Sequence, residues 1–185
     1  MTEATWIDAA VRRARREGWS GETLRRALAD CGEPPELLSS AFPRGVTGAV
    51  DAWLALVDAR MDEAAAAEDL AALRTPQRIR RVVELRLRLL QPDREALRSA
   101  LALLALPWNA PLALRLLART ASAIWHAAGD RSADFSWYTR RATLAAVYSA
   151  TLAFWLRPIE PEMDEVLSFL DRRLQDLPQP ARKAA

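Results

Sequence analysis

Cysteine and histidine are scarce in this chain, and each scarcity excludes a class of protein. The one cysteine, Cys31, cannot form an internal disulfide. The N-terminal segment carries the acidic residues Glu3 and Asp8 where a secretory signal would need an apolar core. We therefore expect a reduced, cytoplasmic protein.

The sequence also lacks the motifs of the common catalytic and metal sites. It contains one histidine, His126, and no Glu-x-x-His pair, cysteine cluster, glycine-rich phosphate loop or Gly-x-Ser-x-Gly. A single histidine near a helix end is more often a hydrogen-bonded structural group than a catalytic acid or base. We expect no enzyme activity, no metal site and no cofactor.

Long apolar runs are absent as well. The two longest charge-free runs, 99–114 and 142–156, are shorter than the roughly 20 apolar residues that a membrane span needs. We therefore expect no transmembrane helix. The 26 basic residues nearly balance the 24 acidic residues, and the formal charge of +2 implies no general attraction to nucleic acid.

Alanine, leucine, arginine and glutamate dominate what is present, and no segment alternates apolar and polar residues as a strand does. This usage predicts an all-α protein of about nine helices. The apolar spacing and the proline and glycine breaks place the helices at about 4–17, 21–30, 34–43, 46–73, 75–90, 91–106, 111–128, 134–156 and 162–175.

Residues 1–45 form a helix–helix–turn–helix order that ends in Phe42-Pro43 and resembles the DNA-binding head of TetR-type regulators. A recognition helix needs basic residues for phosphates and Arg, Asn or Gln for base edges. Residues 33–42 contain Glu33 and Glu36 and no basic residue. We therefore expect a head that does not bind nucleic acid, and a TetR-type ligand-responsive transcription regulator is the alternative function.

The remainder is predicted to form a helical ligand-binding and dimerisation domain at 46–175 and a flexible tail at 176–185. Bulky residues on one face of the penultimate helix neighbour small residues, an arrangement that allows either an apolar cavity or close helix packing. The residues alone favour close packing. The last helix carries an apolar stripe that could face its own core or a second copy, and we expect a homodimer. The stripe consists of Val166, Leu167, Leu170, Leu174 and Leu177.

Residues 125–141 join two of the long helices and carry a recognisable run. Gly129 can close the first helix and Asp134 can cap the second. The run is Trp-His-x-Ala-Gly-Asp-x-Ser-x-Asp-Phe-x-Trp-Tyr-Thr-Arg-Arg. It resembles the family of lipid-binding accessory proteins of coenzyme Q biosynthesis, the ninth member of the Coq set, whose fold is similar to that of TetR regulators.

The resemblance implies a non-catalytic accessory protein that binds isoprenoid quinone intermediates and presents them to a di-iron demethoxyubiquinone hydroxylase. The lipid would lie between helices, against Leu104, Leu116, Leu144, Ala145, Tyr148 and Leu152. The partner would contact Ile124, Asp130, Trp137, Tyr138 and Arg141.

The resemblance also implies peripheral contact with the cytoplasmic face of the inner membrane. Eukaryotic members of the family continue into an amphipathic membrane helix. Here Pro178 and Pro180 prevent a helix in the last ten residues. Two alternatives follow: membrane contact comes from elsewhere, such as the apolar rim around Pro107 and Trp108, or the chain is truncated.

Overall fold

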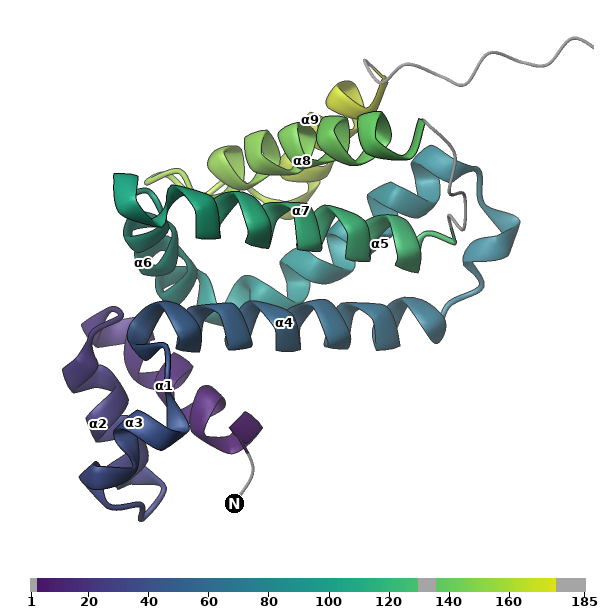
Figure 1. Ribbon diagram of the computed structural model, residues 1–185. Helices are drawn as coiled ribbons and strands as arrows, with labels where there is room; N and C mark the ends of the chain where they lie inside the picture. The colour runs from purple at the N-terminus through teal and green to yellow at the C-terminus, as the bar shows by residue number, and fades with distance from the viewer. Residues whose placement is uncertain (1–2, 130–135, 176–185) are drawn as a thin grey trace, which may run out of the picture.

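The computed structural model describes residues 3–129 and 136–175, and every regular element in these two ranges is helical (Figure 1). The predicted all-α class is confirmed. The predicted tail at 176–185 lies outside the described residues.

The N-terminal head consists of three helices and one 3₁₀ turn: α1 (Glu3–Glu17), α2 (Gly21–Asp30), η1 (Pro35–Leu37) and α3 (Leu38–Ala41). Gly18 ends α1 with a φ of 72°, a conformation that glycine adopts without strain. Ser20 then begins α2, because its hydroxyl accepts a hydrogen bond from the amide of Thr23 at 3.0 Å. The two helices pack through their apolar faces, which bury Ile7, Ala10, Ala14, Leu24, Ala27 and Leu28.

The third helix of the head is shorter than predicted. Instead of one helix over 34–43, the chain makes a single 3₁₀ turn and then the four-residue helix α3. Phe42 leaves the helical conformation, with φ −131° and ψ 68°, and buries its ring in the core. The reason is local, because the ring of Pro43 disfavours a helical residue before it.

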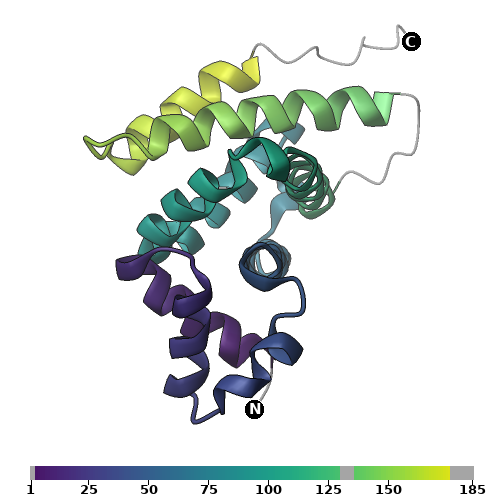
Figure 2. The same cartoon turned by 60° about the vertical axis from the view of Figure 1, so that its left-hand side comes forward.

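The helical domain comprises α4 (Gly45–Ala66), α5 (Thr75–Leu90), α6 (Arg94–Leu104), α7 (Ala110–Ala127), α8 (Ser136–Trp155) and α9 (Met163–Gln175). Short 3₁₀ turns connect several of them: η2 (Leu70–Ala72), η3 (Gln91–Asp93) and η4 (Pro107–Asn109). Helix α7 lies between α4 and the α8–α9 pair, as Figures 1 and 2 both show. The head sits at the N-terminal end of α4.

The prediction that the fourth helix reaches residue 73 was wrong, since α4 ends at Ala66. The carboxylate of Glu68 accepts hydrogen bonds from Arg81 of α5 at 2.7 and 2.8 Å. Leu70 is buried directly afterwards. These two contacts turn the chain back toward α5 instead of letting it continue along the α4 axis.

The described part of the stripe on α9 faces its own core, because Val166, Leu167, Leu170 and Leu174 are at most 6% exposed within the single chain. The fifth residue of the predicted stripe, Leu177, lies outside the described residues. Homodimer formation stays a prediction.

No single helix within the two described ranges is long and apolar enough to cross a membrane. The segments Thr75–Leu104 and Pro107–Ala127 are long and apolar enough only when taken together, and they meet with a bend of 96°.

Candidate functional site

The residues predicted to contact a lipid are mostly core residues. Leu104, Leu116, Leu144, Tyr148 and Leu152 are each at most 9% exposed and belong to the same hydrophobic cluster. Ala145 is half-buried and lies outside that cluster. Helix α8 packs directly on α7 and α9. The structure thus brings five of the six predicted residues into one apolar interior, and it holds the helices there in contact.

A buried polar cluster lies within this apolar interior, centred on Arg86 of α5. The Arg86 Nε donates to the Tyr148 hydroxyl of α8 at 2.8 Å, and its Nη2 donates to the Thr120 hydroxyl of α7 at 3.3 Å. Its Nη1 donates to the Asp58 carboxylate of α4. Arg86 is only 1% exposed. One guanidinium therefore ties four helices together.

The electrostatics of this cluster define its charges. Burial raises the pKa of Tyr148 above its ordinary value, and the opposing effect of Arg86 is smaller. Burial acts to lower the pKa of Arg86, but Tyr148 and Asp58 outweigh it and the net shift is upward. The cluster thus holds a permanently charged guanidinium and a neutral phenol at neutral pH.

A second carboxylate on α4 extends the cluster toward the head. Asp51 accepts hydrogen bonds from Arg119 of α7 and, at 2.8 Å, from Arg44 at the end of the head. The Arg119 Nε also donates to Asp58 at 3.2 Å. Burial acts to raise the pKa of Asp51, but the hydrogen bonds from Arg119 and Arg44 hold it below its ordinary value. A continuous chain of polar contacts therefore runs from Arg44 to Tyr148.

The sequence interpretation did not find this cluster. Its signal is a pair of carboxylates seven residues apart, Asp51 and Asp58, in a stretch of α4 (45–59) that carries no other charged residue. Residues seven apart lie on the same helix face. If that face is buried, both carboxylates enter the core and need basic partners there. The spacing of residues along the sequence does not show which arginines reach these carboxylates.

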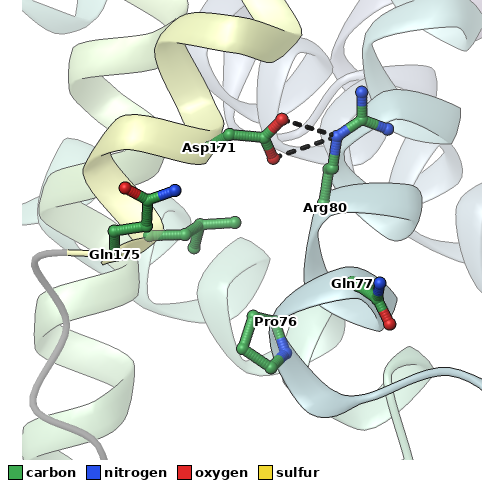
Figure 3. A pocket seen from close by; sticks show the side chains of 6 residues that line it. Pro76, Gln77, Arg80, Asp171 and Gln175 are labelled. Atoms are coloured by element: carbon green, nitrogen blue, oxygen red, sulfur yellow. Dashed lines mark hydrogen bonds and ion pairs between the residues drawn. The ribbon is translucent and has the colours of Figure 1, made fainter.

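A pocket of about 220 Å³ opens between the N-terminal end of α5 and the C-terminal end of α9 (Figure 3). It is lined by Pro76, Gln77, Arg80, Asp171, Leu174 and Gln175. An ion pair of 3.0 Å between Arg80 and Asp171 crosses its wall. Its volume is smaller than the roughly 300–1,000 Å³ of typical ligand sites, and none of the predicted lipid residues lines it.

The residues predicted to contact a partner are only partly placed. Ile124 is fully buried and offers no surface to a partner in this arrangement, whereas Arg141 is half-buried. Trp137 and Tyr138 lie in the first turn of α8, but their side chains are outside the described part of the structure, as is all of Asp130. The Trp125 indole of α7 donates to the Arg140 carbonyl of α8 at 3.2 Å and joins the two helices near this place.

Metal-binding groups do not gather in the part of the chain that the structure describes. No cluster of three or more histidine, cysteine, aspartate or glutamate side chains there could hold a metal ion. His126 is exposed near the end of α7.

Comparison with known proteins gives its strongest match in the C-terminal part of the chain. The family model described as COQ9 matches residues 110–180. "Ubiquinone biosynthesis protein COQ9, mitochondrial" from Rattus norvegicus is 44% identical over 103 residues, which cover 56% of this chain and 33% of that protein. The Homo sapiens protein of the same name gives 44% identity over 103 residues, 56% of this chain and 32% of its own length. The chain thus spans about a third of the length of these relatives.

A more distant relative extends the match through the head. The COQ9 protein of Drosophila melanogaster is 27% identical over 177 residues, covering 94% of this chain and 54% of that protein. The relatives' names place those proteins in mitochondria. The cytoplasmic location expected for this chain stays a prediction.

The fold itself has a solved counterpart. The crystal structure of the TetR transcriptional regulator from Nitrosomonas europaea aligns with a TM-score of 0.74 and 23% identity, over 94% of this chain and 95% of that one. This likeness confirms the predicted TetR-like fold. Residues 110–180, which hold α7, α8 and α9, match the COQ9 family model, and the chain is similar to the curated COQ9 proteins in sequence and to a TetR regulator in fold.

Proposed function

We propose that this protein is a non-catalytic lipid-binding accessory protein of ubiquinone biosynthesis. It binds an isoprenoid quinone intermediate against α7 and α8 and presents it to a di-iron demethoxyubiquinone hydroxylase. The observation that carries the proposal is that the COQ9 match and the residues predicted to contact lipid fall on the same helices. The COQ9 match covers α7, α8 and α9, and four of the five buried residues predicted to contact lipid lie on α7 and α8.

The closed interior sets a physical condition on lipid entry. Because Leu144 and Tyr148 are buried against neighbouring helices, an isoprenoid chain can enter only if α8 separates from α7. The apolar contacts that α8 loses on separation would be replaced by contacts with the isoprenoid chain. The hydrogen bond between Arg86 and Tyr148 opposes that separation and marks the inner end of the proposed site.

The DNA-binding alternative is not favoured. The segment that would read bases is the four-residue helix α3 with its preceding 3₁₀ turn, and it contains no basic residue. Three arginines of α1 and α2 form ion pairs within the head, as Arg13 does with Asp30 at 2.5 Å, and Arg15 pairs with Asp93 of the helical domain. We therefore propose no nucleic-acid partner.

Mass spectrometry of an organic extract of the natively purified protein tests the proposal. We expect near-stoichiometric quinone or polyprenyl lipid, compared with an unrelated helical protein from the same cells. Ala145→Trp should reduce the bound lipid, because it enlarges a half-buried residue of the proposed site. Ala153→Trp is the matched control, since Ala153 is exposed two turns further along the same helix. A protein purified without any lipid would contradict the proposal.

A second arm of the same experiment addresses the partner. Trp137→Lys combined with Tyr138→Ala should abolish co-purification with the hydroxylase while the melting temperature stays nearly unchanged. Ile159→Lys, which alters an exposed isoleucine beyond the opposite end of α8, should leave co-purification intact. Undiminished binding by the double variant would remove Trp137 and Tyr138 from the interface. A large fall in its melting temperature would identify the two rings as core residues.

A further inference from the structure

We propose that the corner between α6 and α7 docks the protein on an anionic membrane surface through Trp108 and Leu114. These side chains are 74% and 68% exposed, and with Ile159 they are the large apolar side chains most open to solvent among the residues described. Pro107, Ala110 and Pro111 are exposed beside them. Such a concentration of exposed apolar surface marks an interaction site.

The shape of the corner fits a flat partner. The segments Thr75–Leu104 and Pro107–Ala127 meet here with a bend of 96°, and the turn lies at one end of the helical domain (Figure 1). A projecting tip can enter a lipid interface, whereas a peptide or small ligand needs a concavity. Trp108 also has the chemistry of the interfacial zone, where an aromatic ring meets acyl chains and the indole N–H meets water or headgroups.

Several polar backbone groups of the corner form hydrogen bonds within the protein and so do not need water as a partner. The Asn109 side chain donates to the Leu103 carbonyl at 2.9 Å, and the Asn109 amide donates to the Leu106 carbonyl at 2.8 Å. Pro107 and Pro111 have no N–H group that would need a partner. Polar backbone groups that enter the interface must be satisfied internally, and this turn meets much of that requirement by itself.

The charge around the corner favours an anionic surface. Residues 96–129 contain no aspartate or glutamate, and their charged residues are Arg98, Arg115 and Arg119. Arg115 follows Leu114 directly and its side chain is 62% exposed. The Arg115 guanidinium lies 3.4 Å from the Asp51 carboxylate, which also pairs with Arg44 and Arg119. Three arginines therefore share one carboxylate, and together these four side chains carry a net positive charge. Anionic lipid attracts such a group.

The third exposed apolar side chain, Ile159, supplies the contrast. It is 89% exposed in the turn between α8 and α9, where Arg157 precedes it and Glu160 and Glu162 follow it, so the charged residues of this turn are net acidic. Carboxylates are repelled by an anionic surface. We therefore place Ile159 outside the docking surface.

Co-sedimentation with lipid vesicles tests the proposal on the full chain. The protein should sediment with vesicles of phosphatidylcholine mixed with phosphatidylglycerol, less with phosphatidylcholine alone, and less as salt increases. Trp108→Ser with Leu114→Ser should lower the ratio of bound to free protein by about tenfold or more, because two large apolar side chains no longer enter the interface. Arg115→Gln should weaken binding only to the anionic vesicles.

Ile159→Ser is the matched control, since it removes an equally exposed apolar side chain and should bind like the parent. A parent protein that binds neither vesicle overturns the proposal, as does a double variant that binds undiminished. Loss of self-association in the double variant, without vesicle binding by the parent, would assign the corner to a protein interface instead. The docking surface does not depend on lipid carriage by α7 and α8, so either proposal can fail while the other holds.

Discussion

The arginines at the surface of the head and those in the interior of the helical domain form ion pairs in opposite surroundings. In the head, the Arg25 and Arg26 side chains are 50% and 53% exposed and pair with Glu22, whose side chain is 48% exposed. In the helical domain, Arg86 is 1% exposed and contacts Asp58, Thr120 and Tyr148. The residue types are similar, and the difference lies in how much water surrounds them.

That difference separates two roles for arginine. Pairs at the head surface stay solvated, so they contribute little to stability and are screened by salt. The charge of Arg86 has been withdrawn from water, so its partners must stay in place for the fold to remain stable. The head is therefore a region where charge is balanced locally, whereas the interior of the helical domain uses charge to hold four helices in register.

The largest expected effect comes from breaking the interior pair. Arg86→Met should lower the free energy of unfolding by about 3–5 kcal/mol, because it leaves Asp58 buried with a weaker set of partners. Urea denaturation measures this loss. Tyr148→Phe removes one hydrogen-bond acceptor and should cost about 1–3 kcal/mol. A loss below about 1 kcal/mol for Arg86→Met would show that the cluster tolerates an uncompensated carboxylate and would end the contrast with the head.

The second prediction concerns Asp51, at the junction of the two regions. Its folded pKa lies below the ordinary carboxyl value, so its contribution to stability is present above about pH 4 and is lost as the pH falls through the folded pKa. Asp51→Asn should cost about 1–3 kcal/mol at neutral pH, since Arg44 and Arg119 lose a charged acceptor. Melting temperatures of parent and variant should converge as the solution is acidified. A constant difference across the acid range would contradict the assignment.

The smallest expected effect belongs to the head. Arg25→Gln with Arg26→Gln removes both arginines that Glu22 binds, yet the urea midpoint should change by less than its experimental error because all three groups remain solvated. Added salt should leave the difference between parent and variant near zero. A destabilisation comparable to that of Tyr148→Phe would show that the head pairs are structural after all.

Much of the helical framework was predictable because its signals are local. Gly18 and Ser20 end one helix and begin the next as expected. The exceptions have local or tertiary causes. Pro43 shortened the third helix through the residue before it, while the end of α4 depended on Arg81, which approaches Glu68 from another helix.

The candidate site was predictable only in part, for a related reason. The apolar stripe of α8 indicated which residues face inward, and Leu144 and Leu152 do so. Periodicity along one helix cannot report whether the facing helix leaves a gap, so the choice between a cavity and close packing stayed open. Periodicity also could not show that Arg86 donates a hydrogen bond to the Tyr148 hydroxyl in the interior of the helical domain.

The sequence by itself determined the all-α class, most helix boundaries, the absence of basic residues from the third helix of the head, and the COQ9 resemblance of residues 125–141. These features depend on neighbours along the chain. The tertiary structure alone decided that Arg44, Asp51, Arg119, Asp58, Arg86 and Tyr148 form one chain of polar contacts, and that Trp108 and Leu114 project from a bend. Burial and ion pairing arise between segments far apart in sequence, where only packing sets the distances and excludes the water.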